Sequence, residues 1–567
     1  MEKLFPIIAT LRNYHKSHLK GDLTAGLIVG ILLVPQGMAY AMIAGLPPVY
    51  GLYAAIFPQI VYALFGSSRQ LAVGPVAMDS LLVATGVSAL AAAGSDHYIE
   101  LAVLLALMIG MIQLTMGLFR LGFLTNFLSR PVITGFTIAA VLIIMVNQLK
   151  YLTGVDLSRS KYLHEIIVEL ISKTSDINWY SFAIGVSGVL LTLVLRKISP
   201  KVPASLVLVV LGSLVVYFFH LETIGVSIIG FVPKGIPSVQ VPTWTWYQIQ
   251  SLLPTAITLA IIGFIEAYSL AQAVQVNHKN EYEVKSNREL IALGMGNMIG
   301  SMFSSFTTTG GFSRTAVNDA AGAKTTLALI FSAMVVLSVL MFMTGLFYYL
   351  PHAALAAIII MAVAGLIKVE EVKRLWKTDR YDFVMMLVAL GGTIMLGIEW
   401  GIGLGVVISL IVLIYKTSTP HIAELGQIEG THTFRNLERF KNAQDRPEIG
   451  ILRFDARLYF ANTVALREKI DEMLAKKTEM KLFVLDAQSI GDVDSSGMET
   501  LHRIYENLNQ RGIQFKLAAV IGPVRDKLYR SGLVSQIGLH NFHESIESAI
   551  GIIPKEEIPF QTNVSGV

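Results

Sequence analysis

Apolar runs of the length needed to cross a lipid bilayer dominate this chain and constrain its fold more than any other feature. The hydrocarbon core of a bilayer is about 30 Å thick and is crossed by about 20 helical residues. Runs of this kind fill residues 24–417 of the 567 in the chain. Charged residues make up only 15% of the chain, whereas soluble proteins carry about 25%. The sequence therefore predicts a polytopic α-helical membrane protein.

Fourteen apolar segments can be distinguished in this region, and the charges between them indicate their orientation. The segments lie at 24–44, 49–66, 73–93, 99–119, 124–148, 180–196, 203–220, 252–275, 288–303, 313–321, 325–349, 352–367, 382–398 and 400–416. Lys and Arg residues concentrate before the first segment and in alternate turns after it. Because cytoplasmic loops are enriched in these residues, we expect a cell (inner or plasma) membrane protein with both termini in the cytoplasm.

The same distribution of charge suggests the domain boundaries. We expect a cytoplasmic N-terminal segment at 1–23, a transmembrane domain at 24–420 and a C-terminal tail at 556–567. Residues 430–555 alternate short β-rich runs with helical patterns, which is typical of a small α/β domain. In that domain Asp494 or Ser495 is suited to cap the helix that follows. Capping alone explains this loop, and phosphorylation of Ser496 is the second interpretation.

Two of the apolar segments are interrupted in a similar way. Gly74-Pro75 lies near the start of the third segment, and Gly310-Gly311 precedes the tenth, which is unusually short. If segments one to seven and eight to fourteen are repeats, each interruption falls in the third segment of its half. Such matched interruptions indicate a transporter site at the interface of an inverted repeat. The alternative is that Gly-Pro is a kink and that the glycines only allow close helix packing.

The charge beside the second interruption favours an anion as the ligand. Arg314 places a positive charge at membrane depth, where a charge usually faces a partner or a water-filled cavity. The N-terminus of a helix also carries unpaired N–H groups and about half a positive charge. Two half-helices that face each other would therefore form a binding site for an anion. A cation site would need carbonyl ends or clustered carboxylates at this place.

Three further polar residues inside apolar segments are candidates, two for binding the anion and one for coupling its transport to protons. Gln36 and Tyr40 are four residues apart in the first segment and would share one helix face. The alternative for this pair is an interhelical hydrogen bond and an ordinary packing residue. Glu266 is the only acidic residue of the eighth segment, and a carboxyl group in a low-dielectric site can carry a proton. Glu266 thus suits a proton-coupled transporter; a structural ion pair with Arg314 and a neutral hydrogen-bonded acid are the alternatives.

Several classes of function are disfavoured by what the sequence lacks. The chain has no cysteine, which excludes disulfides, thiolate catalysis and zinc–thiolate sites. Its twelve histidines show no spacing typical of metal ligands, and no nucleophile–base pair is recognisable. We therefore expect neither a metal site, nor a cofactor, nor an enzymatic activity. The net charge of +4 is weak and the basic residues fall in short loops, which argues against nucleic-acid binding.

Several motifs in the chain resemble those of the sulfate permease (SulP) family. They are VPQG at 34–37, PVYGLY at 48–53, GFSRTAVN at 311–318 and AGAKT at 321–325. In the C-terminal region, DSSG at 494–497 resembles the STAS domain, which is similar to bacterial anti-sigma-factor antagonists. The resemblance extends over essentially the whole chain, with the motifs in the right order.

The resemblance implies a specific fold, which is similar to that of uracil permease. Fourteen spans would form a 7+7 inverted repeat that is divided into a core domain and a gate domain. The core would move as an elevator against the gate, with the anion between the N-termini of spans three and ten. The resemblance further implies a homodimer in the lipid bilayer and cytoplasmic STAS domains that bind a cytosolic protein partner.

The resemblance also assigns roles to individual residues. The anion would be bound by the side chains or the backbone N–H groups of Gln36, Tyr40, Val76, Ala77, Ser313 and Arg314. Glu266 lies where many proton-coupled members of the family have an acid. Ser496 matches the phosphorylated serine of the anti-sigma-factor antagonists, a position that transporter STAS domains often do not use.

We therefore predict a secondary active anion transporter, and specifically a proton-coupled sulfate symporter that works by an elevator mechanism. Glu266 would carry the proton, whereas sodium is the less favoured coupling ion. The alternatives are a sodium-coupled bicarbonate or dicarboxylate symporter and an exchanger of chloride, bicarbonate or oxalate. An anion channel and a membrane-tethered signalling protein that acts through its STAS domain are alternatives of other classes.

Overall fold

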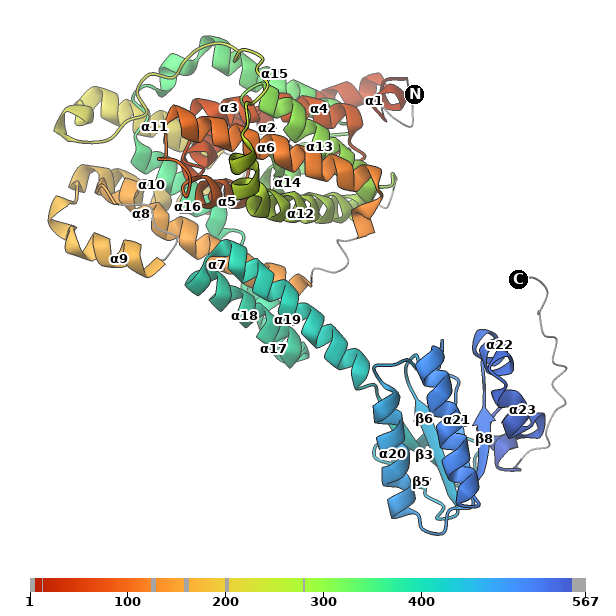
Figure 1. Ribbon diagram of the computed structural model, residues 1–567. Helices are drawn as coiled ribbons and strands as arrows, with labels where there is room; N and C mark the ends of the chain where they lie inside the picture. Colours follow the sequence, from red (N-terminus) through yellow and green to blue (C-terminus); the bar gives the residue numbers. More distant parts are fainter. Residues whose placement is uncertain are drawn as a thin grey trace. The chain divides into compact units, whose positions relative to one another are not determined.

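The computed structural model describes residues 6–12, 14–123, 129–157, 163–198, 203–278 and 281–552. The chain divides into two units, Met1–Ser409 and Leu410–Val567, and the boundary falls inside the long helix α19 (Ile398–Ser418). The first unit is almost entirely helical, and the second unit contains a β-sheet with helices packed on it (Figure 1).

Among the described residues of the first unit, two short strands occur between the helices. Its N-terminal half contains α1 (Pro6–Arg12), α2 (Lys16–Ile43), α3 (Val49–Ala54), α4 (Phe57–Phe65), β1 (Val73–Gly74), α5 (Ala77–Val87), α6 (Asp96–Leu118), α7 (Arg130–Asn147), α8 (Leu149–Thr153), α9 (Leu163–Ser172), α10 (Trp179–Ile198) and α11 (Ala204–Phe219). Its C-terminal half contains α12 (Trp246–Asn277), α13 (Ser286–Met302), β2 (Thr309–Gly310), α14 (Phe312–Ala320), α15 (Leu327–Phe342), α16 (His352–Ala364), α17 (Val369–Thr378), α18 (Arg380–Leu396) and α19.

Every predicted apolar segment contains a helix, although residues 124–128 of the fifth segment lie outside the described residues. Within the described part of the chain, five stretches are long and apolar enough to cross a membrane: Lys16–Ile43, Asp96–Leu118, Arg130–Thr153, Trp246–Asn277 and His352–Thr378. The segment predicted at 49–66 is two helices, because Pro58 occupies the first turn of α4 and favours a new helix start there. The segment predicted at 73–93 begins as a strand and is helical only from Ala77.

Helix α2 lies in the interior of the first unit and touches α3 backbone to backbone. A Cβ atom on Gly51 of α3 would lie only 1.9 Å from the carbonyl oxygen of Gly37 in α2. Any side chain at position 51 would therefore force the two helices apart. This close approach gives the glycine of the PVYGLY motif a structural reason, since only glycine leaves room for the neighbouring backbone.

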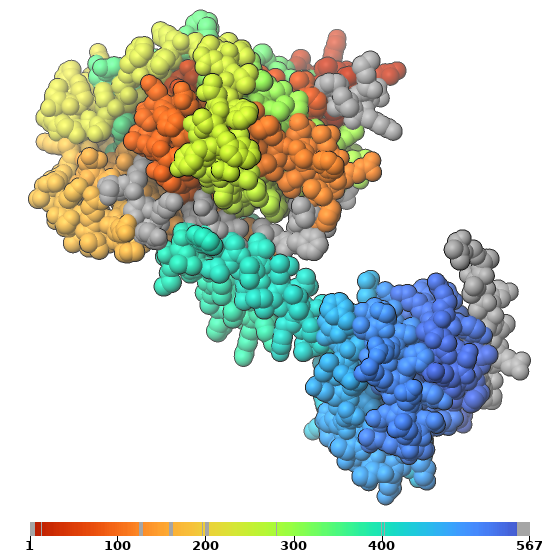
Figure 2. Space-filling model, viewed as in Figure 1, coloured from red at the N-terminus to blue at the C-terminus, as the bar shows by residue number. Residues whose placement is uncertain are grey.

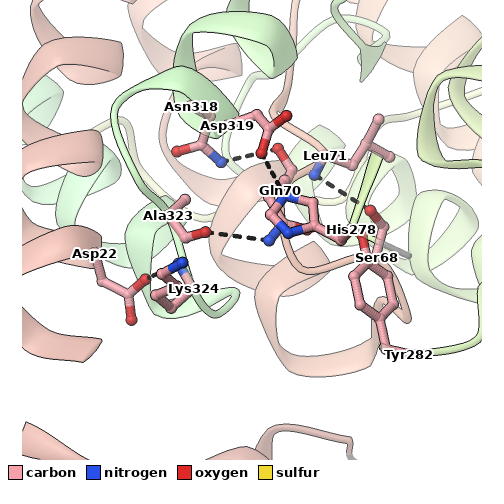
Figure 3. A network of polar contacts seen from close by, with 10 residues as sticks. All are labelled: Asp22, Ser68, Gln70, Leu71, His278, Tyr282, Asn318, Asp319, Ala323 and Lys324. Carbon is pink, nitrogen blue, oxygen red and sulfur yellow. Dashed lines mark hydrogen bonds and ion pairs between the residues drawn. The ribbon is translucent and has the colours of Figure 1, made fainter. Parts of the chain in front are cut away.

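Buried polar contacts anchor the end of α14 and the loop that follows it (Figure 3). The carboxylate of Asp22, which is fully buried, accepts hydrogen bonds from the backbone N–H groups of Lys324 (2.7 Å) and Thr325 (2.9 Å). The side chain of Gln70 donates a hydrogen bond to the carbonyl oxygen of Ala323 over 3.1 Å. Because Asp22 belongs to α2 and Gln70 precedes β1, these contacts fix α14 relative to both.

The long connection between α11 and α12 runs over the surface of the first unit, where it is coloured yellow (Figure 2). Most of its side chains between residues 229 and 245 are exposed or half-buried. Backbone hydrogen bonds from Ile229 to Leu350 (3.0 Å) and from Gln240 to Met302 (2.9 Å) hold it against the unit. The connection therefore lies outside the packed helices and takes no part in the interior, where β1 and β2 lie.

The second unit is built on a mixed sheet with the strand order β4-β3-β6-β7-β8-β9, in which β5 also pairs with β3. Its strands are β3 (Ile422–Ile428), β4 (Phe434–Asn436), β5 (Ala443–Gln444), β6 (Ile449–Phe454), β7 (Leu482–Asp486), β8 (Gln514–Ala518) and β9 (Phe542–His543). Strands β6 to β9 are parallel, whereas β3 is antiparallel to β4, β5 and β6. This alternation of parallel strands and helices is the α/β arrangement that the sequence predicts.

The helices of this unit are α20 (Thr463–Lys476), α21 (Ser495–Gln510), α22 (Gly522–Arg530), α23 (Leu533–Ile537) and α24 (Ile546–Ala549). The predicted cap of α21 is confirmed, because the Asp494 side chain accepts a hydrogen bond from the backbone N–H of Gly497 over 2.7 Å. The short strands β4, β5 and β9 could not be predicted from the sequence, since two or three residues are too few to show an alternation of apolar and polar side chains.

Candidate functional site

The two interrupted segments pair with each other in the interior of the first unit. Strands β1 and β2 are antiparallel, with Val73 opposite Gly310 and Gly74 opposite Thr309. A helix begins directly after each strand: α5 starts at Ala77 and α14 at Phe312. The first turn of a helix leaves backbone N–H groups without intrahelical partners. The pairing therefore brings two such N-termini, which come from opposite halves of the unit, to one place.

Arg314, in the first turn of α14, lies between these elements with only 2% of its surface exposed. Its Nη1 group donates a hydrogen bond to the carbonyl oxygen of Pro75 over 2.9 Å. Its Nε and Nη2 groups have no hydrogen-bond partner among the residues that the structure describes. Buried polar groups are nearly always satisfied in proteins. Two unsatisfied donors on a buried cation therefore mark a place where a negatively charged ligand would be stabilised.

Two glycines, Gly74 in β1 and Gly311 directly after β2, make room for this guanidinium group. A Cβ atom on Gly311 would lie 2.5 Å from Nη2 of Arg314, and one on Gly74 would lie 3.4 Å from the same atom. Gly311 has a φ angle of −97°, which any residue can adopt, so this glycine is required for space rather than for backbone conformation. The sequence around both interruptions is thus shaped to hold Arg314.

A cavity of about 690 Å³ lies against Arg314. Its lining includes Gln36, Ser313 and Arg314, so the structure brings three of the residues predicted to bind the ligand to one cavity. The side-chain oxygen of Gln36 has no hydrogen-bond partner in the described ranges. Thr192 and Ser205 add hydroxyl groups, and the rest of the lining, which comes from α2, α11, α14 and α16, is mainly apolar. Such a cavity can hold a small polar ligand and fix its orientation through a few polar groups.

The remaining three predicted ligands are buried beside this cavity and are not part of its lining. Tyr40 is 5% exposed, one helical turn after Gln36 on α2, and lies close enough to Arg314 for an electrostatic interaction. Val76 and Ala77 are 8% and 3% exposed at the start of α5. Their side chains are apolar, so only their backbone N–H groups can contribute to binding.

Glu266, on α12, faces a second and smaller cavity of about 270 Å³. Thr137, Ser269 and Lys368 supply the other polar side chains of its lining. The charges of Glu266 and Arg314 interact, but the described residues contain no direct ion pair between the two side chains. One carboxyl oxygen of Glu266 has no hydrogen-bond partner in the same part of the chain. The structural ion pair is therefore not formed, and Glu266 lines a different cavity from Arg314.

A network of buried amide and hydroxyl groups holds the paired strands β1 and β2 in place. The sequence analysis did not predict this network. The Asn297 side chain of α13 accepts a hydrogen bond from the backbone N–H of Thr308 (2.7 Å) and donates to the carbonyl oxygen of Thr308 (3.0 Å). The Thr309 hydroxyl donates to the carbonyl oxygen of Gly263 in α12 over 2.6 Å. The signal that could have revealed this network is the cluster of three threonines directly before Gly310.

Asp79 is a second functional candidate that sequence reasoning missed. It lies on the first turn of α5, is 1% exposed and has a side-chain oxygen without a hydrogen-bond partner in the described chain. An acidic residue within an apolar segment, a few residues after Gly74-Pro75, was the available signal. No group of three or more His, Cys, Asp or Glu side chains that could hold a metal occurs among the described residues.

In the second unit, Ser496, the residue for which phosphorylation is predicted, lies at the start of helix α21. Ser496 is half-buried in the first turn of α21, and its carbonyl oxygen accepts a hydrogen bond from the Thr500 hydroxyl over 2.8 Å. The neighbouring Asp494 is occupied by its capping bond to Gly497 and by a bond from the backbone of Phe460. This geometry leaves phosphorylation of Ser496 as a prediction.

Comparison with known families assigns both units. Residues 19–389 match the model of the sulfate permease family, and residues 440–549 match that of the STAS domain. The chain belongs to the sulfate permease family. The resemblance stated from the sequence motifs is thereby confirmed, for the membrane unit and for the STAS domain.

The relatives of this family member include plant proteins. The chain is 37% identical to "Sulfate transporter 4.1, chloroplastic" of Arabidopsis thaliana over 571 residues, which covers 97% of this chain and 83% of the relative. It is 32% identical to "High affinity sulfate transporter 2" of Stylosanthes hamata over 575 residues, which covers 97% of this chain and 86% of the relative. The similarity thus extends over both units.

Solved structures share the fold. The murine Solute Carrier 26 family member A9 anion transporter in the inward-facing state superposes with a TM-score of 0.87 at 25% identity, over 97% of this chain and 94% of that protein. The transmembrane domain of a cyanobacterium bicarbonate transporter, BicA, superposes with a TM-score of 0.61 at 23% identity, over 70% of this chain and 98% of that domain. The fold is therefore that of a helical membrane transporter with a STAS domain.

Proposed function

We propose that this protein is a secondary active transporter that moves sulfate together with protons. The observation that carries the proposal is the buried guanidinium group of Arg314. It has two hydrogen-bond donors without partners among the described residues, and it lies where the pairing of β1 and β2 brings two helix N-termini together. These groups suit a small oxyanion, because N–H donors and hydroxyls can surround its oxygens. The names of the plant relatives support sulfate among the oxyanions.

In the proposed site, sulfate enters the cavity of about 690 Å³ and contacts Arg314, Ser313 and Gln36. The backbone N–H groups of Val76 and Ala77 bind it from the side of α5. Tyr40 contributes its hydroxyl from α2. All of these groups are donors, or can act as donors, and none carries a negative charge that would repel the anion.

We propose Glu266 as the residue that couples transport to protons. A proton bound to its carboxyl group removes one negative charge close to Arg314, which strengthens the attraction of Arg314 for the anion. Release of that proton restores the competition between the carboxylate and the anion for the same cation. The separate cavity beside Glu266 supports this role, because its lining contains neither Arg314 nor Ser313, so that the proton and the anion would be bound in different cavities.

We further propose that fourteen spans form the 7+7 inverted repeat with core and gate domains, and that the core moves as an elevator. The similarity to an anion transporter in an inward-facing state supports a fold of this type. The same proposal includes a homodimer in the cell membrane with both termini in the cytoplasm. It also includes a cytosolic protein partner of the STAS domain and phosphorylation of Ser496. We propose no cofactor and no enzymatic reaction.

Uptake of labelled sulfate into proteoliposomes tests the proposal. We expect uptake to increase when the outside is more acidic than the inside, and we expect Glu266→Gln to remove this dependence while sulfate still binds. Glu289→Gln is the matched control, since Glu289 is also buried but is fully engaged with Tyr62, Ser67 and Ser68. A wild-type protein that responds to a sodium gradient instead of a proton gradient would contradict the proposal.

A further inference from the structure

Asp79 is a buried acid that no step of the proposed cycle uses. Only 1% of its surface is exposed, and its Oδ1 atom has no hydrogen-bond partner within the described ranges. An isolated carboxylate in an apolar interior is strongly unfavourable unless a partner or a proton neutralises it. Asp79 therefore needs one or the other at this position.

The carboxyl group of Asp79 lies against α12, close to Glu266. Its Oδ2 atom is 3.2 Å from the place that a Cβ atom on Gly263 would occupy. Gly263 precedes Glu266 by one helical turn, so the two positions lie on the same face of α12 with about 5–6 Å between their Cβ positions. The two carboxyl groups are close enough for their charges to interact. The Oε2 atom of Glu266 also has no hydrogen-bond partner in the described chain.

When Arg314 is engaged by the anion, the charges around this pair no longer compensate two carboxylates. The titratable groups that face it are Tyr40 from α2, Arg314 from α14 and Lys368, which lines the cavity beside Glu266. Arg314 interacts with Glu266 and with Tyr40, whereas the charged group that acts on Asp79 is Glu266 itself. Two like charges in a low-dielectric site disfavour each other's ionisation. The pair is thus suited to bind protons.

We propose that Asp79 and Glu266 together form a two-carboxyl proton-binding site, and that both carry a proton when sulfate is bound. The protons bind at the two oxygens without partners, Oδ1 of Asp79 and Oε2 of Glu266. When sulfate leaves, Arg314 becomes the counter-charge of the carboxylates and both protons dissociate. This inference rests on the proposed function, and it adds that each sulfate moves with two protons, so that the site has the same net charge when loaded and when empty.

Access to Asp79 passes through Glu266 in this arrangement. Asp79 is almost fully buried, whereas Glu266 is half-buried and lines a cavity. A proton therefore reaches Asp79 by way of the Glu266 carboxyl group. It follows that loss of the Glu266 carboxyl removes both protons from the cycle, and that loss of the Asp79 carboxyl removes only one.

The number of protons per sulfate can be measured at equilibrium in proteoliposomes whose membrane potential is clamped to zero. Each coupled proton contributes about tenfold to the sulfate accumulation ratio per pH unit of gradient. We expect about 100-fold per pH unit for the wild type and for Glu289→Gln, and about tenfold for Asp79→Asn. Asp79→Glu should restore the wild-type value, because it restores the carboxyl group, and Glu266→Gln should show no dependence on the gradient.

The outcomes separate this inference from the proposed function. Equal dependence on pH in the wild type and Asp79→Asn would overturn the two-carboxyl site and leave proton coupling through Glu266 in place. A wild type without any dependence on pH would overturn the proposed coupling itself. If Asp79→Asn does not transport or does not fold, proton uptake on sulfate binding to the wild type in detergent decides the matter. About two protons per sulfate support the site, and one proton overturns it.

Discussion

The side chain of Arg314 donates a hydrogen bond to the backbone carbonyl of Pro75 over 2.9 Å. This bond joins the start of α14 to the loop before α5, residues that are separated by more than two hundred positions in the chain. It uses one of the donors of the guanidinium group and leaves two without partners in the described part of the molecule. The two interrupted segments thus depend on each other for their geometry, and together they hold one cation in position for a ligand.

Removal of that cation should weaken anion binding. We expect Arg314→Ala to raise the dissociation constant for sulfate at least about tenfold, because a hydrogen bond to a charged group contributes about 1.5–3 kcal/mol. Isothermal titration calorimetry on purified protein would measure the change. Lys324→Ala is the matched control: it removes the same charge from an exposed side chain just after α14 and should leave the affinity unchanged. Equal losses in both variants would show that only the overall charge matters.

The position of the guanidinium group should matter as well as its charge. A methyl group on Gly311 would lie 2.5 Å from Nη2 of Arg314, so Gly311→Ala should push the side chain out of place. We expect a roughly threefold to tenfold loss of sulfate affinity, since small displacements of a binding group are costly. Gly345→Ala is the control, because a Cβ atom there meets nothing within 4 Å. An unchanged affinity in Gly311→Ala would argue that Arg314 does not contact the anion from its present position.

The pairing of β1 with β2 can be tested by cross-linking, since the chain has no cysteine of its own. Gly74 and Thr309 are direct partners in the register. Residues opposite each other in an antiparallel pair have Cα atoms about 4.5–5.5 Å apart, which is within the range of a disulfide. We expect the double variant Gly74→Cys/Thr309→Cys to cross-link under mild oxidation, as detected by protection from a thiol-reactive mass tag. Gly74→Cys/Thr307→Cys places the second thiol two residues, or about 7 Å of extended chain, before the partner position and should stay reduced.

In the STAS domain, one carboxylate should make stability depend on pH. Burial opposes the ionisation of Asp455, but hydrogen bonds from Arg453 (2.6 and 2.9 Å) and His421 (2.8 Å) outweigh it and lower the pKa of Asp455. A pKa that is lower in the folded state stabilises the fold above the unfolded pKa of about 3.9, and the effect disappears as the pH falls through the folded pKa.

We therefore expect Asp455→Asn to lower the melting temperature of this domain by a few degrees at pH 7, which corresponds to about 1 kcal/mol. The difference from the wild type should shrink as the pH falls below about 4. Differential scanning calorimetry at several pH values would measure it. Asp471→Asn, which changes an exposed acid on α20, should show no such trend. A difference that stays constant with pH would mean that the charge of Asp455 is not responsible.

The features predicted correctly from the sequence are those that depend on neighbouring residues. The apolar segments, the breaks at Gly74-Pro75 and Gly310-Gly311 and the cap at Asp494 each follow from composition or propensity within a few positions. The structure also brings Gln36, Ser313 and Arg314 to one cavity, and their role in binding an anion stays a prediction. For these three residues, the local sequence pattern and the resemblance to the family predicted the same binding site.

What the sequence could not supply are distances between residues that are far apart in the chain. It assigned Glu266 to proton coupling but could not show that this residue lines a different cavity from Arg314. It did not single out Asp79, because the importance of that residue arises from its position against Gly263 and near Glu266. Nor did it predict that the interrupted segments pair as strands, since two residues in each segment carry no periodic signal.

The sequence by itself determined that this chain crosses a membrane as helices, that two of those helices are broken and that a positive charge lies beside one break. Local backbone propensity and the length of apolar runs are sufficient for these conclusions. Only the tertiary structure decided which groups meet: Arg314 with Pro75, and Asp79 with the turn of α12 that carries Glu266. The physical reason is that burial, charge compensation and unsatisfied hydrogen bonds are properties of the packed interior, where distant segments are brought into contact.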